Sequence, residues 1–136
     1  MLNDVVKKEK FKDVDLTDNF FESLKNDYPK FEEWFKKKGE NLAYVFRDEH
    51  KKIQGFLYLK EETEEDLSIK PIFEKQRRLK VGTFKINAHG TVLGDRFLSI
   101  ILRKFIEENH SMLYVTIFKK HGTLISLFER FGFKKW

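Results

Sequence analysis

Two hydrophobic periodicities alternate in the second half of the chain. β-Forming residues fill Leu79–Ile86, and apolar residues then recur at helical spacing over 97–106. Met112–Phe118 is almost continuously apolar, which predicts a central strand covered on both faces. A second helical pattern over 124–131 ends at Gly132, a typical helix terminator. This order predicts a β-α-β crossover between parallel strands, followed by a helix.

The first half adds a hairpin and two short helices. Leu42–Phe46 and Ile53–Leu59 are β-rich runs joined by a polar connection, the pattern of a hairpin. Upstream, Phe11–Leu16 alternates weakly and predicts a first strand. Asp18 or Asn19 is placed to cap the helix that follows, and a second helix comes after it. The expected order is β-α-α-β-β-β-α-β-α, a mixed α+β fold in one domain over residues 1–136.

Composition excludes several classes of protein. The 136 residues contain no cysteine, which rules out disulfides, thiolate metal sites and a cysteine nucleophile. No apolar stretch is long enough to span a membrane, and the N-terminus lacks the apolar core of a signal peptide. We therefore expect a cytoplasmic protein without membrane partners. No grouping of acidic residues and histidines has metal-ligand spacing, so no metal site is predicted.

Charge is unevenly distributed along the sequence. Residues 1–68 carry 13 lysines and arginines against 17 acidic residues, whereas residues 69–136 carry 14 against 5. A basic second half fits either an anionic ligand or an ordinary solvated surface. The basic cluster Lys75, Arg77, Arg78 and Lys80 allows a third, less favoured interpretation as a nucleic-acid-binding domain, but no stacking motif accompanies it.

The most informative segment is 86–96, where a strand ends, a turn with two glycines follows and an amphipathic helix begins. The first turn of a helix presents unpaired backbone N–H groups and the positive end of the helix dipole. Glycine lets the backbone approach a phosphate closely. The segment therefore predicts a site for a phosphate-bearing cofactor. An ordinary turn with two glycines would have the same sequence pattern.

This segment resembles the pyrophosphate loop of the GNAT superfamily of N-acetyltransferases, whose pattern is Q/R-x-x-G-x-G/A. His89–Gly94 lies in that register and Gly94 matches its last glycine, whereas His89 replaces Gln/Arg and Val92 replaces the middle glycine. The segment Leu127–Phe133 is similar to the family's "L-Y-E-K-x-G-F" helix ending. The resemblance covers about residues 11–133.

The resemblance implies a GNAT-like mixed sheet flanked by helices, with acetyl-CoA as co-substrate. An amine on a small molecule, a peptide or a protein would attack the thioester directly in a ternary complex. Backbone N–H groups would bind the pyrophosphate and polarise the acetyl carbonyl, with basic side chains near the CoA phosphates. The implied cofactor-binding residues are Lys85, Ile86, Asn87, His89, Gly90, Thr91, Val92, Leu93, Gly94, Asp95, Arg96 and His121.

Catalytic residues are less well indicated. The tyrosine that serves as general acid in many relatives corresponds to Phe128, which carries no proton to donate. Glu61 and Glu62 follow a strand that borders the acceptor groove in the family, and either is a candidate base. A solvated loop carboxylate is the plainer interpretation of both. The absence of a phenol at Phe128 also favours a second hypothesis, a non-catalytic GNAT-like module that binds CoA or a partner.

The chain's last residues differ from the family pattern. Relatives usually continue beyond the "G-F" with one or two closing strands, whereas this sequence stops at Trp136. An uncovered edge strand invites pairing. We therefore expect that the closing strands are supplied elsewhere: either the domain is the N-terminal part of a longer protein, or a second copy forms a homodimer.

Overall fold

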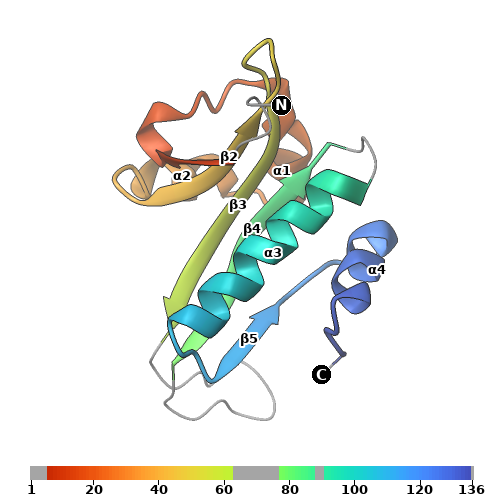
Figure 1. Ribbon diagram of the computed structural model, residues 1–136. Coiled ribbons are helices and arrows are strands. Elements are labelled where there is room, and N and C mark those ends of the chain that lie inside the picture. Colours follow the sequence, from red (N-terminus) through yellow and green to blue (C-terminus); the bar gives the residue numbers. More distant parts are fainter. Residues whose placement is uncertain (1–5, 63–76, 88–90, 136) are drawn as a thin grey trace. The chain divides into compact units, whose positions relative to one another are not determined.

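The computed structural model describes residues 6–62, 77–87 and 91–135 (Figure 1). Among these, five strands form one sheet in the order β1-β2-β3-β4-β5. Strands β1 to β3 pair antiparallel in succession, and β4 pairs with β5 in parallel. The elements are β1 (Lys7–Lys10), α1 (Glu22–Asp27), α2 (Phe31–Lys37), β2 (Leu42–Arg47), β3 (Ile53–Glu62), β4 (Arg78–Ile86), α3 (Thr91–Glu107), β5 (Met112–Val115) and α4 (Gly122–Arg130). The expected mixed α+β order is confirmed.

The chain divides into two compact units. The first comprises Met1–Tyr58 and Thr83–Ala88, and the second comprises Leu59–Gly82 and His89–Trp136. Strands β3 and β4 are therefore each divided between the two units.

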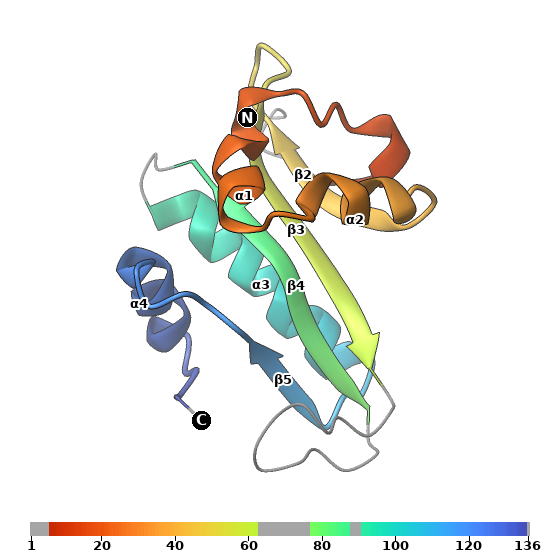
Figure 2. The same cartoon turned by 180° about the vertical axis from the view of Figure 1, so that it is seen from behind.

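The core of the first unit is built from aromatic rings. Phe11 lies among them, with its ring edge-to-face to those of Trp34, Phe56 and Tyr58 at centroid distances of 5.7, 5.5 and 5.3 Å. Such contacts add to the free energy gained from burial itself. Helices α1 and α2 cover one face of the β2–β3 hairpin (Figure 2). Six of the fifteen phenylalanines in the sequence belong to this ring-packed core.

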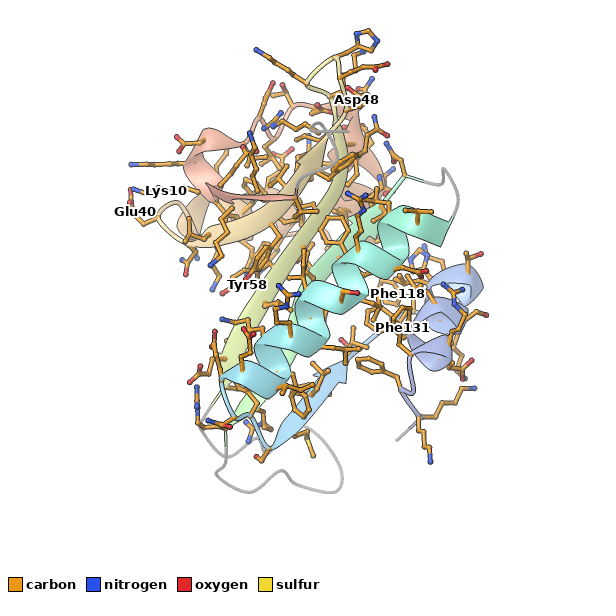
Figure 3. The ribbon with its side chains drawn as sticks, in the orientation of Figure 1. Lys10, Glu40, Asp48, Tyr58, Phe118 and Phe131 are labelled. Atoms are coloured by element: carbon orange, nitrogen blue, oxygen red, sulfur yellow. The ribbon has the colours of Figure 1, made fainter. Side chains whose placement is uncertain are left out.

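Local hydrogen bonds set the boundaries of the first unit's elements. Of the two possible caps, Asp18 is the one used. It caps the 3-10 turn Asn19–Phe21 that leads into α1, and its carboxylate accepts the Phe20 N–H at 2.8 Å. In the β2–β3 turn the Asp48 carboxylate accepts the backbone N–H groups of His50 and Lys52 at 2.8 and 3.0 Å. Figure 3 shows Asp48 at the tip of this hairpin. It also shows Lys10 beside Glu40, where Lys10 Nζ lies 3.0 Å from Glu40 Oε1.

The predicted first strand is displaced. We expected it at Phe11–Leu16, whereas β1 is Lys7–Lys10 and Phe11 begins a 3-10 turn, Phe11–Asp13. The Phe11 N–H donates to the Asn41 carbonyl, and the Phe11 ring enters the core. Because β1 lies at the sheet edge, its side chains are mostly exposed and lack the alternation that marks a half-buried strand.

In the second unit, α3 lies along one face of the sheet beside β5 (Figures 1 and 2). Its buried residues are Phe97, Leu98 and Ile101, which recur at the spacing expected for one helix face. The prediction that Met112–Phe118 forms a central, doubly covered strand is wrong. Strand β5 is last in the sheet order, ends at Val115 and is only half-buried. A continuous apolar run does not reveal which strand is at an edge.

Candidate cofactor site

The beginning of α3 carries half of the predicted cofactor-binding residues, Thr91 to Arg96. His89 and Gly90 lie outside the described residues, whereas the helix begins at Thr91 and continues for 17 residues. In its first turn Gly94 is buried, Leu93 is half-buried and Val92 is 65% exposed. The first N–H groups of a helix have no partner within the helix, so this turn is suited to binding an anion.

Two charged residues follow in the next turn. The Asp95 carboxylate accepts a hydrogen bond from the Arg130 guanidinium at 2.7 Å, which ties the beginning of α3 to the end of α4. Arg96 is exposed. The helix therefore places Arg96 just after its N-terminal turn, while a second cation, Arg130, neutralises the Asp95 carboxylate.

His121 is the residue immediately before α4. Its carbonyl accepts the Ile125 N–H, and its ring centroid lies 6.0 Å from that of Phe118. The Lys120 ammonium lies over the same Phe118 ring at 5.7 Å. Figure 3 shows Phe118 near α4. A positively charged segment thus precedes α4, as the sequence predicted, and whether it contacts CoA stays a prediction.

Lys85, Ile86 and Asn87 belong to the first unit, at the end of β4. The Lys85 ammonium donates to the Phe20 carbonyl and lies 4.7 Å from the centroid of that residue's ring. Partial burial lowers the pKa of Lys85 below the usual range for lysine. The Asn87 backbone N–H donates to the Gln54 carbonyl at 2.9 Å, so this N–H is already engaged.

Glu61, the first candidate base, is held in an ion pair. Its carboxylate accepts three hydrogen bonds from the Arg77 guanidinium at 3.0 to 3.2 Å. These bonds are the main reason that the pKa of Glu61 is lowered. His110 lowers the same pKa by a smaller amount. A carboxylate with a lowered pKa is a weaker base, because it gains less from taking up a proton.

Glu62, the second candidate, lies in a more enclosed setting. Its carboxylate accepts a hydrogen bond from the Tyr114 hydroxyl and lies 3.8 Å from Nε of Arg78, whose side chain is buried. Sequence reasoning missed both partners. Tyr114 lies opposite Lys80 in the parallel β4–β5 ladder, and only that register brings it to the end of β3. A phenol and a carboxylate in contact are suited to moving a proton.

Phe128 is part of the core of the second unit. It is 2% exposed, and its ring meets that of Phe133 edge-to-face at 4.9 Å. The contact belongs to a helix-ending motif in which the Phe133 N–H donates to the Phe128 carbonyl and the Gly132 N–H to the Glu129 carbonyl. The residue that the sequence resemblance matches to the family's acid tyrosine therefore serves packing in this chain.

Several of the solved structures similar to this chain carry acetyltransferase names. A probable acetyltransferase matches with a TM-score of 0.67 at 15% identity, covering 96% of this chain and 90% of its own. The ribosomal-protein-alanine N-acetyltransferase of Brucella melitensis biovar Abortus 2308 matches at 0.61 and 11%, covering 97% and 96%. Chaetomium thermophilum Naa20, solved with a bisubstrate analogue, matches at 0.62 and 16%, covering 94% and 70%.

No protein-family model matches the chain, and no curated protein matches its sequence. The likeness is therefore one of structure, and it extends over nearly the whole chain. The protein has the GNAT N-acetyltransferase fold, as the sequence resemblance predicted. Within the described residues, no helix is both long and apolar enough to cross a membrane.

Proposed function

We propose that the protein is an N-acetyltransferase that transfers the acetyl group of acetyl-CoA to an amine. The observation that carries the proposal is the helix that begins at Thr91, set in a fold shared with several acetyltransferases. The bisubstrate analogue bound to Chaetomium thermophilum Naa20 supports the use of two substrates in one complex by proteins of this fold.

In this proposal the backbone does most of the binding. The free N–H groups of residues 91–94 bind the pyrophosphate. Arg96 is the cation closest in sequence to the start of α3, and the His121 imidazole lies immediately before α4. The acceptor's nitrogen lone pair attacks the thioester carbon. A C–N bond forms, the C–S bond breaks, and the CoA thiolate leaves. The nitrogen loses its proton to a base, and the thiolate takes one from water.

Glu62 is the better of the two candidate bases. Glu61 is occupied by the Arg77 guanidinium, which lowers the pKa of its carboxyl. Glu62 also lies near cations, 3.5 Å from Lys60 Nζ and 3.8 Å from Arg78 Nε, but it contacts a phenol as well. A proton accepted there has a route through the Tyr114 hydroxyl. We expect Glu62→Gln to lower kcat about 10²-fold or more, the lower end of the usual contribution of a general base, while acetyl-CoA affinity is unchanged.

A second function is favoured by Phe128, which is buried and has no ionisable proton. With no acid at this position, the fold would bind CoA without turning it over. The two functions differ in one outcome. Both predict binding of acetyl-CoA, and only the first predicts that CoA thiol is released when an amine is added.

Calorimetry with acetyl-CoA tests binding, and Ellman's reagent tests turnover. The chain has no cysteine, so every thiol detected in the second assay is CoA. Arg96→Ala removes the cation at the beginning of α3, and we expect about tenfold weaker binding, as for loss of a charge-assisted hydrogen bond. Arg103→Ala is the matched control, an exposed arginine two turns further along the same helix. No binding heat at millimolar acetyl-CoA would refute both functions.

A further inference from the structure

Three side chains with metal-ligating atoms meet in the second unit, where β3 ends and α3 leads into β5. They are Glu61, Glu108 and His110, and one ligand atom from each lies within 4.8 Å of the others. They come from separate parts of the sequence, which explains why spacing along the chain did not predict the group. Exposed acidic side chains often lie close together without a metal ion, so the histidine is the residue that points to a metal site.

The His110 side chain is fully buried, at 0% exposure. Its ring stacks on that of Phe105 with a centroid distance of 6.5 Å and an angle of 16°. Among the residues that the structure describes, neither ring nitrogen has a hydrogen-bond partner. A buried polar group without a partner is costly, and an imidazole always carries at least one N–H. Something that binds a ring nitrogen would relieve this cost.

The backbone fixes the direction of this ring. Asn109 adopts a positive φ of 56°, which turns the chain sharply after α3. The His110 N–H donates to the Phe105 carbonyl at 3.2 Å, and the Ser111 N–H donates to the Arg77 carbonyl at 2.8 Å. With both neighbouring peptides held, the imidazole is directed inward and Nε2 faces the Glu61 carboxylate.

The separation between the two nearest ligand atoms fits a metal. His110 Nε2 and Glu61 Oε2 are 3.4 Å apart, a long distance for a hydrogen bond. Two ligands at about 2.1 Å from a tetrahedral ion are themselves about 3.4 Å apart. The two atoms therefore already stand at the spacing of zinc ligands.

We propose that Glu61, Glu108 and His110 bind a divalent transition-metal ion, with Zn²⁺ as the test ion. One imidazole nitrogen and two carboxylate oxygens suit Zn²⁺ and its neighbours in the first transition row, whereas Mg²⁺ prefers oxygen ligands alone. A fourth position is open to water, because Glu61 and Glu108 are both partly exposed.

Two cations already hold the carboxylates. Arg77 binds Glu61, and the Lys104 ammonium lies 2.9 and 3.0 Å from the two Glu108 oxygens. A carboxylate has about four lone-pair positions, so it can keep such a partner while it coordinates a metal. The cations nevertheless oppose a third positive charge. Removing Lys104 should therefore strengthen metal binding, an effect that a purely structural ion-pair cluster would not produce.

The site does not depend on the proposed acetyltransferase function. Helix α3 extends roughly 24 Å from Thr91 to Glu107, and the metal group lies just beyond its C-terminal end. A bound ion would join the end of β3 to the α3–β5 turn. We thus expect Zn²⁺ to raise the thermal stability of the protein without any requirement for acetyl-CoA.

Calorimetry on the tag-free protein tests the proposal, with Co²⁺ absorption as a second readout of the ligand geometry. The side chains of Glu61 and Glu108 are partly exposed, so replacing them leaves the core intact. Each of the variants Glu61→Gln and Glu108→Gln should weaken Zn²⁺ binding at least about tenfold. His110→Gln should abolish it, with circular dichroism to confirm folding. Lys104→Met should tighten binding.

His50→Gln is the matched control. His50 Nε2 also lies near a carboxylate, 3.7 Å from Glu49 Oε1, but on an exposed turn of the first unit. This variant should bind Zn²⁺ as the unchanged protein does. The proposal fails if no Zn²⁺ binds, if Mg²⁺ binds equally well, or if Glu61→Gln and Glu108→Gln bind Zn²⁺ with unchanged affinity.

Discussion

The two glycines that flank α4 give a sharp test of the helix's end. Gly132 has a φ of +97°, in the region that disfavours residues with a Cβ, whereas Gly122 is the first residue of the helix. A Cβ added at either position meets no atom within 4 Å. Alanine substitutions at the two sites therefore differ only in backbone conformation, and we expect them to change stability in opposite directions.

The expected change in the free energy of unfolding follows from the backbone conformation at each glycine. A positive φ costs an L-residue about 1–2 kcal/mol, partly offset by the smaller entropy of the unfolded chain, so Gly132→Ala should destabilise by about 1 kcal/mol. Gly122→Ala should stabilise by about 0.5–1 kcal/mol, because alanine is the better helix former. At about 2.1 cal/mol/K per residue, 1 kcal/mol corresponds to about 3.5 °C in Tm for this chain.

Thermal unfolding followed by far-ultraviolet circular dichroism measures both variants. The Tm values should differ by about 5–7 °C, with the unchanged protein between them. If Gly132→Ala is as stable as Gly122→Ala, the left-handed ending of α4 is wrong. The contact between Phe128 and Phe133 that this ending sets up would then lose its explanation.

Three further predictions concern the first unit. Phe11→Ala should destabilise by about 3–5 kcal/mol in urea unfolding, because the ring is at the centre of the aromatic core, whereas exposed Tyr28→Ala should cost under about 0.5 kcal/mol. Asp48→Ala should lower the urea midpoint at neutral pH. The Lys52 N–H is the main cause of the lowered pKa of Asp48, so the difference from wild type should vanish as pH falls through that folded pKa. Burial lowers the pKa of Lys85, so the unfolded chain keeps this proton to higher pH. Stability should therefore rise as pH approaches the ordinary lysine pKa, and Lys85→Met should remove that rise in urea midpoints measured across the alkaline range.

Local patterns predicted the elements whose hydrophobic residues share one face. Helix α3 buries Phe97, Leu98 and Ile101 as the spacing indicated, and the β2–β3 hairpin has the expected partners. The displacement of β1 has the opposite cause. Lys7–Lys10 is an exposed edge, whose pairing with β2 comes from backbone hydrogen bonds that leave no pattern in the side chains.

The site was predicted only where it follows the chain. Thr91 to Arg96 are consecutive residues at the beginning of one helix, so their proximity needs no tertiary information. The contact of Glu62 with Tyr114, and that of Glu61 with His110, depend on strand register and on the α3–β5 turn. Neither register nor turn direction is encoded in local spacing, because a shift of one residue would turn each side chain to the other face.

We propose that the beginning of α3 binds the phosphates of acetyl-CoA. Amide chemical shifts in two-dimensional NMR, recorded as acetyl-CoA is added, measure this binding residue by residue. We expect the N–H signals of residues 91–96 to shift with saturation, while those of the β2–β3 turn at Asp48 do not. Saturable binding that leaves residues 91–96 unmoved, or no binding at millimolar acetyl-CoA, would contradict it.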